Sequence, residues 1–306
     1  MKVCVVGCGA IGSLFAAHLA RVDGVEVYAF DVWKDHVKAI NERGLRISGA
    51  AEFTAKVRAT TTVGEIPRCD YGIVATKSLH TKAAIEQTAH LFDEHSAVCS
   101  IQNGVGNEEI LAQHVKYVIR GTTFPAGHVI EPGQVGYDIS GDTWIGPFEP
   151  SNTPMRMVEE LAAAITKGGM NTLAMQDARG AQWAKLIFNA STNPVGALTH
   201  LHHGAATFYE PTGELFNALI EEGIAVARAQ GIELHGDPRE LVLQGAKAPG
   251  KHKASMLQDI LAGRQTEVDF MNGAIVQWGE KVGVPTPLNK ALWALVKGLE
   301  HSWTNP

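Results

Sequence analysis

Lys2-Val-Cys-Val-Val-Gly7-Cys-Gly9-Ala-Ile-Gly12 opens the chain and is its most informative stretch for the fold. Residues 2–6 are compact and mostly β-branched, which predicts a short buried strand that ends at glycine. The mostly apolar residues 13–21 predict a helix directly afterwards. Gly-x-Gly-x-x-Gly between a strand and a helix is the fingerprint of dinucleotide-binding domains. The first glycine makes a tight turn, the second lets the backbone approach the pyrophosphate, and the third allows close packing.

The loop of this fingerprint is a candidate phosphate site, because a helix N-terminus offers free N–H groups and a positive dipole end. The alternative is an ordinary tight turn, which the complete strand–turn–helix context disfavours. The candidate cofactor-binding residues of the loop are Gly7, Cys8, Gly9, Ala10, Ile11 and Gly12.

A second strand over residues 25–30 ends at Asp31, 19 positions after Gly12. An acidic residue at this distance hydrogen-bonds the ribose hydroxyls of NAD and repels the 2′-phosphate of NADP. Asp31 therefore favours NADH over NADPH. Two alternatives stay open: a plain surface aspartate at a strand end, and acceptance of NADP by the nearby Lys34.

Strands and helices continue to alternate, and two later strands deliver polar side chains at their carboxyl ends. A buried strand over 71–75 leads to Lys77, and one over 97–101 leads to Gln102-Asn103-Gly104. Ligands of open α/β sheets bind at these ends, so Lys77 and Asn103 are expected near the cofactor. Lys77 could equally be an ordinary surface lysine. Other expected elements are a helix over 34–42, a helix ending at Phe92, and strands over 45–48, 53–59 and 117–123.

The character of the chain changes twice after residue 123. Residues 126–147 predict an antiparallel hairpin extension, with turns at Glu131-Pro132-Gly133 and Gly141-Asp142. A helix over 154–166 and a strand over 171–175 complete a Rossmann-like α/β domain over residues 1–176. Residues 177–306 show helical periodicity only and predict an all-α domain. Its helices are expected near 180–193, 213–229, 238–247, 255–262, 267–282 and 287–300.

A polar stripe marks the first of these helices. Lys185, Asn189 and Asn193 are spaced by four residues, about 400° of a helix, so each step drifts only about 40° around the axis. Trp183, Leu186, Ile187 and Phe188 supply apolar neighbours, which suggests a functional face turned into a cleft. The alternative is an exposed face of solvated polar residues.

Bulk properties exclude several classes of protein. The chain has 306 residues, 45% hydrophobic and 19% charged, which suits two soluble domains. A net charge of −6 gives no footprint for nucleic acid or an anionic membrane. Glycines interrupt the apolar N-terminus, so we expect neither a signal peptide nor a membrane span. The four cysteines form no Cys-x-x-Cys pair and fit a reducing cytoplasm. His200, His202 and His203 lack the spacing and acidic partners of a metal site, so no metal is expected.

Four motifs together resemble the ketopantoate reductase (2-dehydropantoate 2-reductase) family, in order and over essentially the whole chain. They are the glycine fingerprint, Gln102-Asn103-Gly104, Trp183-Ala-Lys-Leu-Ile-Phe-Asn-Ala-Ser-Thr-Asn-Pro194, and Ser255-Met-Leu-Gln-Asp-Ile-Leu-Ala-Gly-Arg-Gln-Thr-Glu-Val-Asp-Phe-Met-Asn-Gly273. The last string is long and idiosyncratic. The resemblance implies NAD(P)H-dependent reduction of the 2-keto group of ketopantoate to (R)-pantoate, and it is compatible with a homodimer.

The resemblance also assigns roles to single residues. Lys185 matches the catalytic lysine that donates a proton to the carbonyl oxygen, and Glu267 matches an active-site glutamate. Other residues match family positions that contact the ligands. Those that match substrate contacts are Asn189, Asn193 and Ser255. Asn103 matches a contact with both nicotinamide and substrate, and Lys77 and, more loosely, Ala126 match cofactor contacts. On one straight helix Ser255 and Glu267 would lie about 120° apart. Gly263 and a potential N-cap at Thr266 instead predict two helices that meet at a break.

The chemistry of the residues agrees with these roles. Reduction of a keto acid needs a proton for the developing alkoxide, and a lysine with a pKa of about 10.4 is protonated at neutral pH. Two positions depart from the family, which usually has a basic residue where Asp31 stands and often an asparagine where His203 stands. They leave open an NAD-dependent D-2-hydroxyacid dehydrogenase acting on another branched or aromatic keto acid. A dinucleotide-binding sensor without catalysis would leave Lys185 and Glu267 idle.

Overall fold

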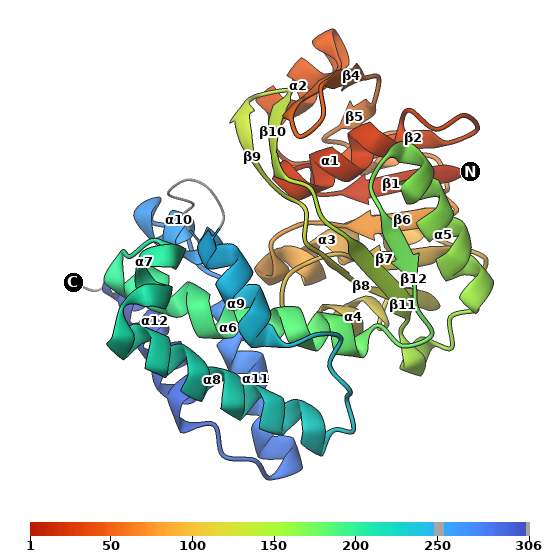
Figure 1. The fold of residues 1–306 in the computed structure, drawn as a ribbon. Coiled ribbons are helices and arrows are strands. Elements are labelled where there is room, and N and C mark those ends of the chain that lie inside the picture. The colour runs from red at the N-terminus through yellow and green to blue at the C-terminus, as the bar shows by residue number, and fades with distance from the viewer. Residues whose placement is uncertain (248–253, 304–306) are drawn as a thin grey trace. The chain divides into compact units, whose positions relative to one another are not determined.

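The computed structural model describes residues 1–247 and 254–303, and it divides into two compact units. Unit 1 comprises Met1–Gln102 and Asn107–Ala178, and unit 2 comprises Asn103–Gly106 and the chain from Arg179 onward. The expected domain boundary lies at residue 176, and no sequence pattern indicates that Asn103–Gly106, which follow a sheet strand, belong with the helical unit. The expected fold class, an α/β dinucleotide-binding domain followed by a helical one, is confirmed (Figure 1).

Unit 1 is built on an eight-stranded sheet with the order β12-β11-β8-β7-β6-β1-β2-β5. All neighbours pair in parallel except β8 and β11, which are antiparallel. The chain fills one side of β1 before crossing to β6 on its other side, so the carboxyl ends of β1 and β6 form a topological switch point. The strands are β1 Lys2–Val6, β2 Glu26–Phe30, β5 Arg58–Thr60, β6 Tyr71–Val74, β7 Ala97–Ser100, β8 Tyr117–Thr123, β11 Thr143–Pro147 and β12 Thr172–Ala174.

A second sheet of four strands, in the order β4-β3-β10-β9, packs on the helix that follows β1. Its antiparallel hairpin of β9 and β10 turns at the expected Pro132-Gly133. Helix α1 therefore lies between the two sheets, and residues 12–19 are all buried. The strands are β3 Leu45–Gly49, β4 Phe53–Ala55, β9 Ala126–Glu131 and β10 Gln134–Ile139, and the helices of unit 1 are α1 Ala10–Leu19, α2 Lys34–Arg43, α3 Thr81–Thr88, α4 Asn107–Leu111 and α5 Met155–Gly168.

Two apolar cores cover the two faces of the large sheet. Alternate residues of β1 divide between them, because successive side chains of a strand point to opposite faces. Val3 and Val5 join the core with α1 and α5, whereas Cys4 and Val6 join the core that includes α3. A strand buried on both faces explains the continuous apolar run of residues 3–6.

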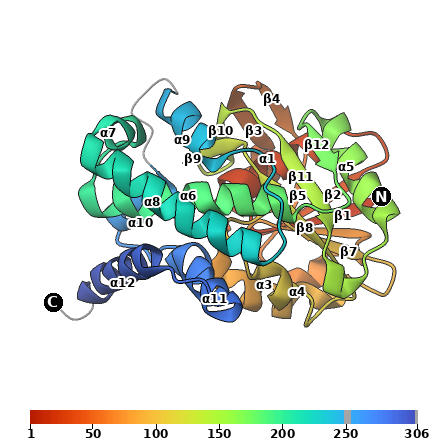
Figure 2. The ribbon, with the colours of Figure 1, turned by 60° about the horizontal axis from the view of Figure 1, so that its bottom comes forward.

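Unit 2 is a set of helices around α6, Arg179–Thr199, which packs against α8, α9, α10 and α12 (Figure 2). Its core holds the apolar neighbours of the polar stripe, among them Trp183 and Ile187. The other helices are α7 His203–Phe208, α8 Glu210–Ala229, α9 Pro238–Lys247, α10 Ser255–Leu261, α11 Asn272–Val282 and α12 Pro287–Ser302.

Several expected elements differ from the structure. The first helix of unit 2 continues through Pro194 to Thr199 instead of ending at residue 193. The strand expected over 53–59 is two strands, β4 and β5, in different sheets. The helix expected over 267–282 begins only at Asn272, after a 3-10 turn over Val268–Phe270. Helices α4 and α7 were not predicted, because both are short and have weak periodicity.

Candidate active site

The polar stripe of α6 is not a solvated face. Asn189 and Asn193 are 7% and 6% exposed, and Lys185 is half-buried. Burial of polar side chains costs free energy unless they find other hydrogen-bond partners, because each loses its contact with water. The exposed-face alternative is therefore wrong, and the structure brings the three side chains together on one buried stripe.

The Glu267 carboxylate acts electrostatically on Lys185, and the pKa of Lys185 reflects two opposed effects. Burial lowers the pKa of Lys185 to about 8, because removal from water penalises the ammonium, and the Glu267 carboxylate partly offsets this by raising it. A lysine with this pKa is mostly protonated at pH 7 and can also release its proton readily. Such tuning is typical of groups that transfer protons.

Glu267 lies between two residues that are hydrogen-bonded to α12, Thr266 and Asp269. On one side, the backbone N–H and the hydroxyl of Thr266 both donate to Glu300, each at 2.7 Å. On the other side, the Asp269 carboxylate accepts from the Trp293 indole at 2.6 Å and from Lys297 at 2.9 Å. Glu267 itself is 4% exposed. Its position is thus set by residues about 30 positions later in the chain.

The segment Asn103–Gly106, which follows Gln102, docks onto the residues around Glu267 within unit 2. Asn103 Nδ2 lies 3.5 Å from Glu267 Oε2, and Val105 donates its backbone N–H to the Phe270 carbonyl at 3.0 Å. Gly104 has a φ of +84°, and a Cβ there would lie 2.2 Å from the Phe270 carbonyl oxygen, so only glycine fits. Asn103 is therefore a neighbour of Glu267.

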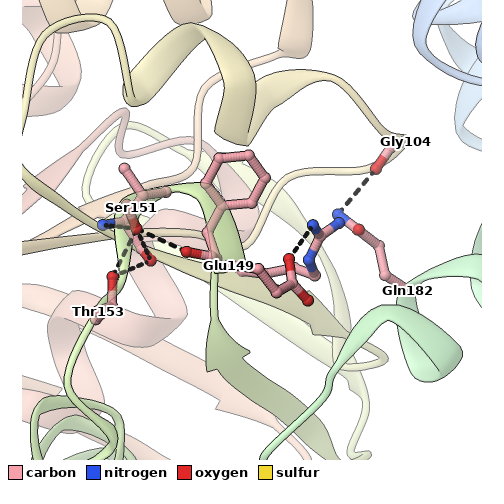
Figure 3. A network of polar contacts seen from close by, with 8 residues as sticks. Gly104, Glu149, Ser151, Thr153 and Gln182 are labelled. Carbon is pink, nitrogen blue, oxygen red and sulfur yellow. Dashed lines mark hydrogen bonds and ion pairs between the residues drawn. The ribbon is translucent and has the colours of Figure 1, made fainter.

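Gln182, one turn before Lys185, completes this docking. Its side-chain amide donates to the Gly104 carbonyl at 3.3 Å, as Figure 3 shows. Sequence reasoning missed Gln182, although its spacing of three residues from Lys185 places both on neighbouring parts of the helix surface.

The predicted break between Ser255 and Glu267 is confirmed, but Glu267 precedes a 3-10 turn and does not begin a second helix. Helix α10 begins at Ser255 and ends at Leu261, and Gly263 follows with a φ of +62°. The Thr266 hydroxyl accepts the Val268 N–H at 3.3 Å, but the N-cap residue of the 3-10 turn is Glu267, so the N-cap expected at Thr266 is wrong. Ser255 is half-buried on a helix that packs against α6.

His203 makes contacts with two other helices of unit 2. Its Nε2 lies 2.9 Å from the Val242 carbonyl oxygen, and its ring packs against Phe188 and against Gly245 of α9. The ring therefore links α7 to α9. Among residues 1–247 and 254–303, no three His, Cys, Asp or Glu side chains gather as metal ligands.

The glycine loop of unit 1 has the geometry that each glycine requires. A Cβ on Gly12 would lie 1.9 Å from the Gly7 carbonyl oxygen, and a Cβ on Gly7 would lie 2.6 Å from Thr76. Beside Gly9, in contrast, a Cβ would meet nothing within 4 Å. The loop is thus tightly packed at its first and third glycines and open at the second, which fits the approach of a pyrophosphate to α1.

Asp31 closes the same loop. Its carboxylate accepts the backbone N–H of Cys8 at 2.6 Å and that of Trp33 at 2.8 Å. Both oxygens are therefore oriented by the backbone, and each retains a lone pair for another donor. Lys34 and Lys77 are exposed, and Ala126 is the half-buried first residue of β9.

Gln102 is the second residue that sequence reasoning left without a role. Its amide donates to the Thr76 carbonyl at 3.0 Å and to the Thr81 hydroxyl at 2.7 Å. These contacts fix the loop after β6, which carries Lys77. Gln102 belongs to the Gln-Asn-Gly motif, but only the fold shows that it joins the segments that follow β6 and β7.

Comparison with known proteins gives a consistent result for both units. The family profile described as ketopantoate reductase PanE/ApbA matches residues 3–150, and the profile of its C-terminal region matches residues 177–300. The 2-dehydropantoate 2-reductase of Pyrococcus horikoshii is 35% identical over 98% of both chains.

Solved structures share the fold over the whole chain. A PanE/ApbA family ketopantoate reductase from Ralstonia eutropha JMP134 is 30% identical, with a TM-score of 0.88 and full coverage of both chains. A D-mandelate dehydrogenase in complex with NADH and anilino(oxo)acetate is 27% identical, with a TM-score of 0.89 over 99% of this chain and 100% of the other.

Proposed function

The chain belongs to the ketopantoate reductase family, and we propose that it reduces the 2-keto group of ketopantoate to (R)-pantoate with a nicotinamide dinucleotide. The observation that carries this proposal is the half-buried Lys185 on the polar stripe of α6, with a pKa of about 8 and the Glu267 carboxylate nearby. Full-length relatives that are 2-dehydropantoate 2-reductases support it.

The proton donor in this proposal is the Lys185 ammonium. As the carbonyl oxygen gains negative charge, a fixed ammonium stabilises the developing alkoxide more than the neutral ketone and then transfers a proton to it. Glu267 holds the ammonium in place and favours its charged form. Asn103, Asn189, Asn193 and Ser255 are proposed to orient the keto acid, because amides and hydroxyls can bind its polar groups without adding charge.

The cofactor in this proposal is NADH, which supplies the hydride when bound. Gly7–Gly12 fit its pyrophosphate, since the loop is open at Gly9 and leads into the N-terminus of α1. Asp31 would accept the ribose hydroxyls with its two oriented oxygens. Lys77 and Ala126 are proposed as further cofactor contacts.

Two further points belong to the proposal. The four cysteines are free and buried, which fits a reducing cytoplasm, and a homodimer is proposed on family grounds. No helix in the described part of the chain is long and apolar enough to cross a membrane.

A panel of keto acids tests the proposed substrate. We expect ketopantoate to be reduced with a higher kcat/KM than 2-ketoisovalerate or phenylglyoxylate, measured as loss of NADH absorbance. Ketopantoate carries a hydroxyl that buried amides such as Asn189 and Asn193 can bind, and sites built to bind a hydroxyl reject analogues that lack it. A preference for phenylglyoxylate would instead favour the D-2-hydroxyacid dehydrogenase. Tight NADH binding without any turnover would favour the sensor.

The pKa of Lys185 predicts opposite pH profiles for the two directions of the reaction. Reduction needs the ammonium, so its kcat/KM is expected to be flat below pH 8 and to fall about tenfold per pH unit above it. Oxidation of pantoate needs the free amine, so its kcat/KM should rise up to pH 8 and then level off. Initial rates from pH 6 to 10 in both directions provide the check. A reduction profile that stays flat to pH 10 would contradict the role of Lys185.

A further inference from the structure

Helix α6 contains a proline in its interior, between the substrate-binding stripe and the helix end. Pro194 has no backbone N–H, and it directly follows Asn193. A proline inside a helix removes the hydrogen bond to the carbonyl four residues earlier and pushes that carbonyl away. The carbonyl of Ala190 is therefore left without its helical donor, one residue after Asn189.

Asn272, the first residue of α11, supplies the missing donor. Its Nδ2 donates to the Ala190 carbonyl oxygen at 2.9 Å, and its side chain is fully buried. The preceding residue also contacts the break, because Asn193 Nδ2 lies 3.7 Å from the sulfur of Met271. Ala190 and Asn193 of α6 therefore contact two consecutive residues, Asn272 and Met271.

The orientation of the Asn272 amide follows from a chain of donors and acceptors. The Glu222 carboxylate can only accept, so Asn289 turns its Nδ2 toward it at 2.8 Å. Asn289 Oδ1 then faces Asn272 and accepts from its Nδ2 at 3.0 Å. Within the described residues Asn272 Oδ1 has no partner, so the amide is held through its two donor contacts.

Glu222 is itself fixed by the N-terminus of α12. Its two oxygens accept the backbone N–H groups of Leu288 and Asn289, each at 2.9 Å. Free N–H groups and a positive dipole end make such a terminus a strong site for a carboxylate. The chain of contacts therefore runs from α8 and α12 through two buried asparagines to the break in α6.

We propose that Asn272 is a positioning residue for the keto acid site: it replaces the hydrogen bond that Pro194 removes and so fixes Asn189 and Asn193. The inference rests on the proposed function for its kinetic readout. It assigns no contact with substrate to Asn272. Without the Asn272 donors, the buried Ala190 carbonyl has to find another partner, and the turn of α6 that carries both asparagines shifts. Misplacement by about 1 Å can lower a rate about 100-fold.

A double-mutant cycle with Pro194→Ala tests this idea. Alanine at 194 restores a backbone N–H that can serve the Ala190 carbonyl from within α6. Asn272→Ala alone is expected to lower kcat/KM for the keto acid by about 10- to 100-fold, mainly through a higher KM, with the KM for NADH changed by less than about twofold. Combination with Pro194→Ala should recover most of that loss, whereas Pro194→Ala alone should have little effect. Losses that simply multiply would overturn the proposal.

The matched control is Val296→Ala, which removes buried apolar volume from the same helical core without touching α6 hydrogen bonding. It should lower the melting temperature while the KM for the keto acid stays unchanged. An equal KM increase in Val296→Ala would assign the Asn272 effect to general loosening and contradict the proposal. If Asn272→Ala does not fold, Asn272→Ser, whose hydroxyl can donate one hydrogen bond, takes its place in the cycle.

Melting temperatures of the same four proteins, the wild type, the two single variants and the double variant, separate this inference from the proposed function. Should the wild-type chain reduce no keto acid, the proposed function fails. The hydrogen-bond replacement is then decided by stability alone. Melting-temperature losses of Asn272→Ala that Pro194→Ala offsets support it, and losses that add contradict it.

Discussion

Lys185→Ala is expected to lower turnover by about 100- to 10,000-fold, the usual contribution of a positioned acid. The ammonium of Lys185 is the only group to which the proposed mechanism assigns the proton, and its pKa of about 8 keeps it mostly charged at pH 7. NADH binding should change by less than about twofold, because the glycine loop and Asp31 belong to unit 1 and contain no part of α6. Turnover and fluorescence titration with NADH measure the two quantities.

Two control variants separate charge from packing at this position. Lys185→Met keeps the apolar stem and should be as inactive as Lys185→Ala. Lys185→Arg keeps a positive charge, but a guanidinium hardly releases its proton, so stabilisation without transfer should leave it partly active at best. A small primary amine added to Lys185→Ala should restore part of the rate. Retention of more than about a tenth of wild-type turnover in Lys185→Met would remove Lys185 as the acid.

A strong preference for NADH over NADPH is the second large effect that we expect. A 2′-phosphate beside the Asp31 carboxylate would meet like charge, and two unit charges about 4 to 8 Å apart at an effective dielectric of about 20 repel by roughly 2 to 4 kcal/mol. Before screening by salt, this corresponds to a ratio of kcat/KM values between about 30-fold and about a thousandfold. Measuring kcat/KM with both cofactors at fixed ionic strength gives the ratio.

Substitutions at Asp31 have to respect its contacts with the backbone N–H groups of Cys8 and Trp33. Asp31→Asn removes the charge and keeps one acceptor, so it should weaken discrimination with a modest loss for NADH. Asp31→Arg should shift preference toward NADPH, but it also breaks both contacts, so activity with NADH should fall more. Lys34→Ala should leave the ratio unchanged. A wild-type chain that prefers NADPH would contradict the assignment of Asp31. Loss of the preference for NADH in Lys34→Ala would contradict it as well.

Local patterns were sufficient wherever neighbouring residues decide the structure. The glycine fingerprint depends on contacts among Gly7, Gly12 and the adjacent strand end, and the spacing of its three glycines predicted the observed loop. The four-residue spacing of Lys185, Asn189 and Asn193 likewise required only helical geometry. The pattern suggested a face turned into a cleft, but it left a solvated face open, because an amphipathic pattern alone does not distinguish the two.

The sequence-based predictions failed where distant residues decide the structure. Pro194 predicts a helix end, and α6 continues because Asn272, 78 positions later, takes the carbonyl that proline leaves unpaired. Residues 267–271 have helical periodicity, yet Trp293 and Lys297 hold Asp269 in another arrangement, and Glu300 holds the preceding residue, Thr266. In both places tertiary hydrogen bonds override local propensity.

The assignment of Asn103–Gly106 to the helical unit has a consequence for biosynthesis. These four residues leave the ribosome well before Gln182, Glu267 and Phe270, with which they form their contacts. An N-terminal unit that folds first therefore presents a loop whose partners do not yet exist. The helical half, cut free at Arg179, would lack the strand-end loop that docks beside its glutamate. Unit 2 can therefore complete its packing only after Gln182, Glu267 and Phe270 have been made, and the two units are not separable as contiguous segments of the chain.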